Sequence, residues 1–166
     1  DSIVFKKSDT WYTNSHGKMV RQGAPAIMAR NIALPDVKSE GLTPYVMASK
    51  FPNGAVAIAT EGRVTPDNSW QQPKADITLK EAELNKPIGI FGQYKSLTLE
   101  FSRKLNKIKI YGQDLMAENA LNITKKVTIK GNKVIIPGDL IDSVGTMAGD
   151  EGGISAPGMV IKIIPN

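Results

Sequence analysis

Apolar and polar residues alternate along several short stretches of the chain, which is the pattern of strands that bury one face. The clearest case is 97–101, Leu-Thr-Leu-Glu-Phe, and a second such run, 108–111, follows a turn-like segment. We expect these two strands to form a hairpin or to be neighbours in one sheet.

A second pair of strands, 127–130 and 133–136, flanks the dipeptide Gly131-Asn132. Both residue types tolerate the positive φ angles of a tight hairpin turn, so the sequence predicts a hairpin here. Because side chains alternate between the two faces of a strand, we expect Ile129 and Ile135 to face the core and the neighbouring lysines to face water.

Further short runs are rich in β-branched and aromatic residues and are bounded by the 15 glycines and 10 prolines of the chain. The predicted strands are 3–6, 45–51, 55–60, 75–79, 88–91 and 159–164, with weaker runs at 18–21 and 26–30.

Short helical turns are predicted at 114–122, with Asp114 as N-cap, and after Asp139 up to Gly145. About ten strands at this spacing predict an all-β fold: a two-layer antiparallel β-sandwich of jelly-roll or immunoglobulin type.

The chain has 166 residues, a length that suits one hydrophobic core. We expect a single domain over 1–166, in which 1–36 forms an N-terminal arm. Because the sequence begins at Asp1 without a methionine, we expect it to be part of a longer parent protein. No stretch approaches the roughly 20 apolar residues that a membrane-spanning helix needs, which predicts no membrane-spanning segment.

The composition excludes several kinds of chemistry. The chain has no cysteine, so disulfides, thiolate metal sites and cysteine nucleophiles are excluded. Its one histidine, His16, lies in a polar turn-like stretch, and no glycine-rich segment has the pattern of a phosphate-binding loop. The sequence thus predicts a non-catalytic protein without a required cofactor. Asp150 and Glu151, which lie among glycines, could supply oxygen ligands to Ca²⁺, although they lack the alternating pattern of a dedicated calcium loop.

Three stretches together resemble a known class of domain: 22–31, 52–60, and 99–111 with the following Gln113-Asp114-Leu115. They resemble the accessory or C-terminal β-sandwich domains of secreted carbohydrate-active and sugar-binding proteins of Bacteroidetes-like bacteria. The resemblance implies a periplasmic, secreted or cell-surface protein that takes part in glycan use. Its partner would be a glycan or a neighbouring catalytic domain.

An aromatic platform beside hydrogen-bonding side chains is the usual receptor for a sugar, which presents C–H faces and hydroxyl groups. Trp70 is the best candidate, because it lies in a polar segment bounded by Pro66 and Pro73. The candidate ligand-binding residues are Trp70, Asp67, Asn68, Gln71, Gln72 and, on a predicted strand elsewhere, Trp11. The alternative interpretation is that Trp70 folds back and closes the edge of a sheet.

Two other functions remain open. A glycoside hydrolase needs only a pair of carboxylates, and the candidates are Glu61, Asp67, Glu81 with Glu83, and Asp139 with Asp142. A purely structural domain would instead support a neighbouring catalytic domain through an exposed apolar patch, for which 26–29 is the candidate. The net charge of +5 comes from dispersed lysines that fit the outward faces of strands, so no nucleic-acid partner is predicted. A charged face of this kind could also bind an anionic polysaccharide.

Overall fold

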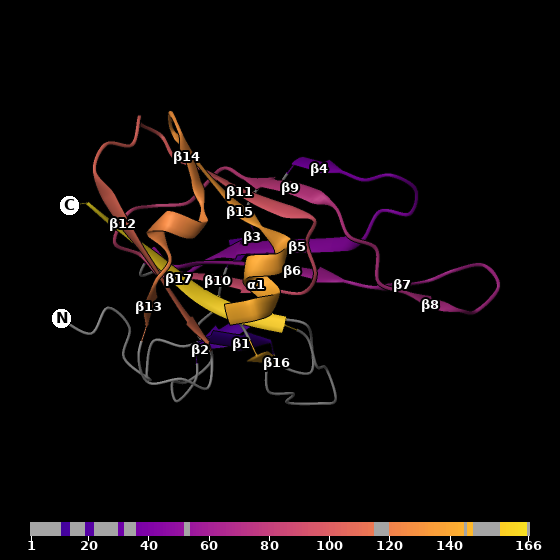
Figure 1. Ribbon diagram of the computed structural model, residues 1–166. Coiled ribbons are helices and arrows are strands. Elements are labelled where there is room, and N and C mark those ends of the chain that lie inside the picture. Colours follow the sequence, from indigo (N-terminus) through magenta and orange to yellow (C-terminus); the bar gives the residue numbers. More distant parts are fainter. Residues whose placement is uncertain are drawn as a thin grey trace.

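The computed structural model describes residues 11–13, 19–21, 30–31, 36–51, 54–114, 120–144, 146–147 and 157–165. Its strands form one sheet of eight strands and one of five, together with two separate two-stranded ribbons (Figure 1). The two larger sheets share one buried apolar cluster. The predicted all-β sandwich is confirmed.

The larger sheet has the strand order β13-β12-β17-β10-β6-β5-β3, and β16 also pairs with β17. The strands are β13 (Leu121–Asn122), β12 (Ile108–Asp114), β17 (Pro157–Pro165), β10 (Ile88–Phe91), β6 (Val56–Glu61), β5 (Tyr45–Lys50), β3 (Arg30–Asn31) and β16 (Thr146–Met147). Strands β5 and β6 correspond to the predicted strands 45–51 and 55–60, and they pair with each other in antiparallel orientation.

The smaller sheet has the strand order β14-β15-β11-β9-β4. Its strands are β14 (Thr128–Lys130), β15 (Lys133–Pro137), β11 (Ser96–Glu100), β9 (Asp76–Leu79) and β4 (Asp36–Lys38). One pair in each sheet is parallel, β6 with β10 and β9 with β11, so the sheets are mixed rather than wholly antiparallel. Parallel neighbours need a crossover connection, and here each crossover passes through a strand of the opposite sheet.

The pairing predicted for 97–101 and 108–111 is wrong. These segments form β11 and β12, which belong to different sheets. The connection between them crosses from one sheet to the other and buries Phe101 and Leu105 in the shared core. An alternating pattern means only that one face of a strand is buried. Both strands bury their apolar face in the core between the sheets, so they need not pair with each other.

The predicted hairpin at Gly131 is confirmed, because β14 and β15 pair in the expected register and Gly131 has a φ of +63°. The assignment of Ile135 to the core is wrong, whereas Ile129 faces the core side as predicted. Val134 and Ile136 are fully buried, whereas Ile135 lies half-buried on the outer face of the sheet. Ile129 lies opposite Val134 but on the edge strand, where 39% of it stays exposed.

Helix α1 (Gly138–Val144) corresponds to the helical turn expected after Asp139 and buries Leu140 and Ile141 in the shared core. Asp139 lies in the first turn instead of beginning the helix, a position where its charge suits the helix dipole. The turn expected at 114–122 is wrong at both ends, since Asp114 ends β12 and 121–122 forms β13. A short 3-10 helix, η2 (Thr124–Lys126), follows β13.

The larger sheet also buries side chains on the face that points away from the smaller sheet. Ala57, Ala59, Phe91 and Val160 are at most 3% exposed, although none belongs to the core between the sheets. The ribbon of β1 (Trp11–Thr13) and β2 (Met19–Arg21) lies on this side, with β1 against β10 and β17 (Figure 1). The ribbon of β1 and β2 therefore adds a further layer, and the predicted strand at 18–21 corresponds to β2.

The predicted strand at 3–6 and most of the one at 26–30 lie outside the described residues. Within the part that the structure describes, no helix has the length and apolar character needed to cross a membrane.

Candidate functional site

A two-stranded arm extends from the sandwich at the end of β6. It consists of β7 (Arg63–Val64) and β8 (Trp70–Gln71), joined by a turn at 65–69, and it projects well beyond both sheets (Figure 1). The segment that the sequence identified as a polar loop is thus a ribbon with a defined register. In it, Val64 lies opposite Trp70 and Arg63 lies opposite Gln71.

The turn of the arm is held by backbone and side-chain hydrogen bonds among its own residues. The backbone amide of Asn68 donates to the carbonyl of Thr65 at 2.9 Å, which closes a turn with Pro66 in its second position. Asn68 adopts a φ of 64°, a left-handed conformation that asparagine tolerates better than most residues. The Asp67 carboxylate accepts hydrogen bonds from the hydroxyls of Thr65 and Ser69 and from the Ser69 amide.

These hydrogen bonds give Asp67 a structural role in the arm. The bonds from Thr65 and then from Ser69 lower the pKa of Asp67 from 3.8 to about 2. A carboxylate held this way stays ionised at every physiological pH. One of its two oxygens, Oδ1, accepts all of these hydrogen bonds within the turn. Asp67 and Asn68 therefore build the tip of the arm, and their predicted contacts with a ligand would compete with this role.

Trp70 is displayed on one face of the arm. It is 63% exposed and its neighbour Val64 is 62% exposed, which excludes the alternative that Trp70 closes the edge of a sheet. Gly62 lies buried beneath the indole, since a Cβ atom at this position would come within 2.6 Å of Trp70 Cε2. The missing side chain lets the ring rest against the backbone, so the indole is supported on one side and open to solvent on the other.

The opposite face of the arm attaches it to the sandwich. The Arg63 guanidinium lies over the ring of Tyr45, 4.7 Å from its centroid, and donates a hydrogen bond of 3.1 Å to the carbonyl of Thr43. Stacking of a cation on an aromatic ring is worth roughly 0.5–1 kcal/mol at an exposed site. The arm therefore leaves the sandwich in a fixed direction, and Gln71 shares this face with Arg63 by strand alternation.

The structure thus separates the residues predicted to bind a ligand. Trp70 is presented to solvent, and Gln71 is exposed but lies on the other face. Gln72 is half-buried, with its amide nitrogen buried and lacking a hydrogen-bond partner among the described residues. Trp11 lies on β1, a strand that packs against β10 and β17, and so belongs to another part of the molecule.

Sequence reasoning missed two residues of this site, Val64 and Gly62. Val64 continues the apolar face of Trp70 across the ribbon, and Gly62 makes room for the indole. The signal for the ribbon was present, because Thr65-Pro66-Asp67-Asn68 combines residue types that favour a turn and stands between a valine and a tryptophan. Nothing in the sequence marked Gly62 as the support of the ring.

Several candidate carboxylates of the enzymatic alternative have structural contacts. Asp67 holds the turn of the arm, and Glu83 forms an ion pair of 2.8 Å with Lys50. Asp139 and Asp142 are exposed on the short helix α1. Among the described residues, no group of three or more His, Asp or Glu side chains is placed to hold a metal ion. His16, the apolar segment 26–29 and the calcium candidates Asp150 and Glu151 lie outside the described residues.

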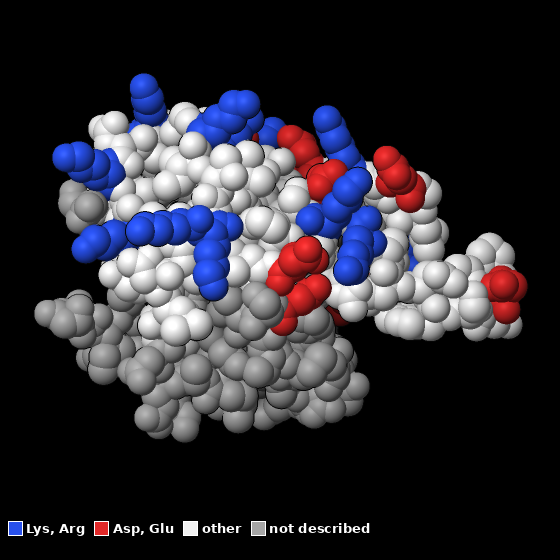
Figure 2. Space-filling model, viewed as in Figure 1, with Lys and Arg blue, Asp and Glu red and all other residues white. Residues whose placement is uncertain are grey.

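Charge is distributed unevenly over the molecule. Figure 2 shows lysine, arginine and acidic side chains over the body of the sandwich, whereas the outer part of the arm carries only acidic atoms at its tip. From Val64 to Gln72 the only charged residue is Asp67. The face around Trp70 therefore suits an uncharged ligand or an apolar surface.

We compared the chain with known protein families, curated proteins and solved structures. No protein-family model matches the chain, and no curated protein and no solved structure is significantly similar to it.

Proposed function

We propose that the chain is a non-catalytic, carbohydrate-binding accessory module of an extracytoplasmic glycan-processing system, and that it binds sugar at Trp70. The observation that carries the proposal is the indole itself, 63% exposed on a projecting arm and supported from below by Gly62. Large aromatic side chains are usually mostly buried, so a tryptophan exposed in this way suits contact with a ligand or with another molecule.

The chemistry of the arm supports a neutral sugar as that contact. A pyranose ring offers a flat face of C–H groups, and an indole offers a flat apolar surface that gains from dispersion and from burial. Val64 extends this surface, and the absence of charge next to Trp70 avoids the cost of desolvating an ion. The extracytoplasmic setting rests on the resemblance to accessory domains of secreted carbohydrate-active proteins.

Calorimetric titration of the chain with neutral polysaccharides tests this proposal. Trp70→Ala should weaken binding at least tenfold, which corresponds to about 1.4 kcal/mol. Trp70→Phe should retain part of the affinity, because it keeps a flat aromatic face. The matched control is Gln71→Ala, which changes the opposite face of the same strand and should bind like the wild type. Failure to bind any neutral glycan, or equal binding by Trp70→Ala and the wild type, would overturn the proposal.

One observation favours a second function, that of a structural domain docked on a neighbouring catalytic domain. Val64 and Trp70 are both more than 60% exposed and lie side by side, as residues do at the centre of a protein interface. In that case Val64→Ala and Trp70→Ala should both weaken the contact with the neighbour, and neither should affect a glycan titration. For sugar binding, Trp70→Ala should have much the larger effect.

A further inference from the structure

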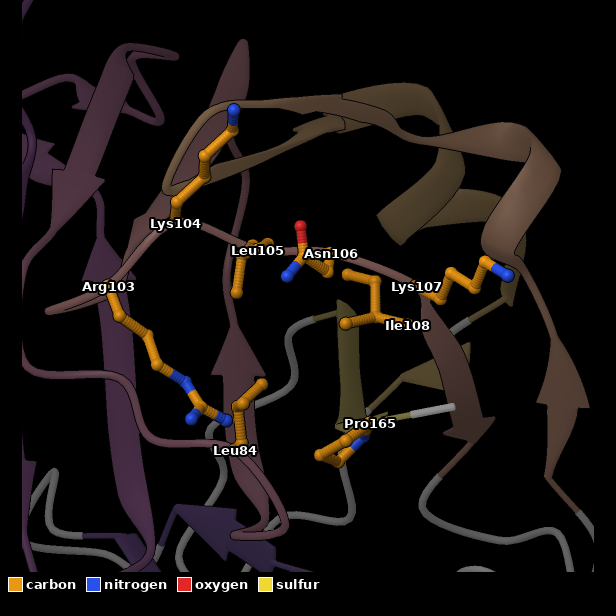
Figure 3. A pocket seen from close by; sticks show the side chains of 8 residues that line it. All are labelled: Leu84, Arg103, Lys104, Leu105, Asn106, Lys107, Ile108 and Pro165. Carbon is orange, nitrogen blue, oxygen red and sulfur yellow. The ribbon is translucent and has the colours of Figure 1, made fainter.

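A groove lies at the end of the sandwich where the chain crosses between the sheets. Its volume is about 760 Å³, which is within the range of pockets that hold small ligands. Leu84, the connection 103–107, Ile108 at the start of β12 and Pro165 at the end of β17 line it (Figure 3). Trp70 is not among the lining residues, so this groove is separate from the face of the arm.

The walls of the groove are held by hydrogen bonds from neighbouring elements. The amide of Leu105 donates to the carbonyl of Gly131 at 2.9 Å, and Asn132 exchanges two bonds of 2.9 Å with the backbone of Phe101. On the other side, the amide of Asn85 donates to the carbonyl of Ile163 at 2.8 Å. The groove is therefore formed before any ligand arrives, which lowers the entropic cost of binding.

The lining combines an apolar floor with a basic rim. Leu105 and Ile108 are 7% and 8% exposed, and Leu84 is half-buried. Arg103, Lys104 and Lys107 are exposed, and none of the described residues that line the groove is acidic. In Figure 3 the Arg103 side chain runs toward Leu84, whereas the Lys104 and Lys107 side chains point away from the groove.

A second, smaller groove of about 400 Å³ shows that this charge arrangement is not general. Its lining also includes three lysines, Lys38, Lys74 and Lys95, but these are accompanied by Glu40 and Asp76. The charges there compensate one another within the groove. Only the larger of the two grooves presents cations without nearby acidic residues in its lining.

We propose that the larger groove binds an acidic oligosaccharide, a chain of sugars that carry carboxylate groups. The C–H faces of the sugar rings suit the apolar floor, and a carboxylate suits Arg103, which runs toward Leu84 in the groove. Lys104 and Lys107 add positive charge at the outer rim, where their exposed, flexible side chains can meet further carboxylates. The planar guanidinium of Arg103 can hold one carboxylate through two parallel hydrogen bonds. Among the lining residues that the structure describes, none is aromatic and could stack on a nucleobase, so single-stranded nucleic acid is less suited to the groove.

Calorimetric titration with an oligogalacturonate tests the proposal, with its methyl-esterified form as the uncharged counterpart of the same chain. We expect the acidic form to bind and the ester to bind at least tenfold more weakly. Affinity for the acidic form should fall about tenfold between 50 and 200 mM salt, as expected when a few charges are neutralised. The same titrations with a sulfated oligosaccharide establish whether carboxylate or any anionic group is recognised, since preference for sulfate would overturn the assignment to carboxylates.

Two double variants with the same change in charge locate the site. Lys104→Gln with Lys107→Gln should lower the affinity at least tenfold, and Arg103→Gln should lower it further. Lys74→Gln with Lys95→Gln removes two cations from the smaller groove and should bind like the wild type. Each side chain is exposed, so the variants should fold, and unchanged thermal melts verify this.

Equal losses in the two double variants would show that binding depends only on net charge and would overturn the proposal. Tighter binding of single-stranded DNA than of oligogalacturonate would overturn it in favour of a nucleic acid. Trp70→Ala should bind oligogalacturonate like the wild type, so the outcome here is independent of the outcome at the arm.

Discussion

A single methyl group at Gly62 should remove the support of the indole without disturbing the core. In Gly62→Ala, the new methyl carbon would lie 2.4 Å from Trp70 Cζ2 and 2.5 Å from the main-chain oxygen of Gln71, whereas ordinary contacts begin near 3.4 Å. The ring and the facing strand must therefore move by about 1 Å or the ribbon must open. Overpacking of this kind costs about 1–3 kcal/mol.

This cost should fall on the arm alone, because neither Gly62 nor Trp70 belongs to the core between the sheets. If the arm unfolded together with the sandwich, each kcal/mol of destabilisation would lower the thermal midpoint by about 2–4 °C. Because the arm lies outside the core, we expect the midpoint of the sandwich to change by less than about 2 °C. In NMR spectra the indole N–H resonance of Trp70, assigned with Trp70→Phe, should shift while that of Trp11 stays. Binding of a neutral glycan should weaken at least tenfold. An unmoved Trp70 resonance together with full binding would refute the idea that the ring rests on Gly62, and Val64→Ala serves as a control that removes apolar surface without a clash.

Three further predictions concern the turns and the core. Gly131→Val should destabilise the protein by about 1–3 kcal/mol, because a β-branched residue is strained at a φ of +63° even though open space surrounds the position; an unchanged melting temperature would contradict this assignment, and glycan binding at the arm should be retained. Tyr94→Phe should cost about 1 kcal/mol in denaturant unfolding, because the buried hydroxyl donates a hydrogen bond of 2.7 Å to the carbonyl of Phe91; a variant as stable as the wild type would show that this bond contributes nothing. The pKa of Asp67 is lowered to about 2 by its hydrogen bonds in the turn, so the carboxylate stabilises the arm fully above pH 3.8 and this stabilisation is lost as the pH falls through about 2; Trp70 fluorescence followed from pH 5 to pH 1 should report the loss, and the absence of a transition in Asp67→Asn is the control.

Local sequence patterns were sufficient for features that depend on neighbouring residues. The Gly131-Asn132 turn, the strands at 45–51 and 55–60 and the helical turn near Asp139 all formed where they were predicted. In each case the backbone preferences of a few consecutive residues determine the conformation. The all-β class followed in the same way from many short alternating runs.

Tertiary structure decided which strands pair and where the paired strands lie. The segments 97–101 and 108–111 have the same alternating pattern, and yet one entered the smaller sheet and the other the larger. Alternation records that a strand has a buried face but carries no information about its partner. The groove at 103–107 is a consequence of this crossing, so no local pattern could have revealed it.

The candidate site shows the same division. The sequence by itself identified Trp70 as an aromatic residue in a polar segment, a description that fits both an exposed platform and a ring that closes a sheet. The structure decided between them, because the paired strands of the arm carry Trp70 away from the sheets and place it over Gly62. The structure also places Gln71 on the opposite face of the arm and uses the Asp67 carboxylate to hold the turn through hydrogen bonds. Exposure depends on what the rest of the chain places around a side chain, and that is a property of the folded molecule rather than of the neighbouring sequence.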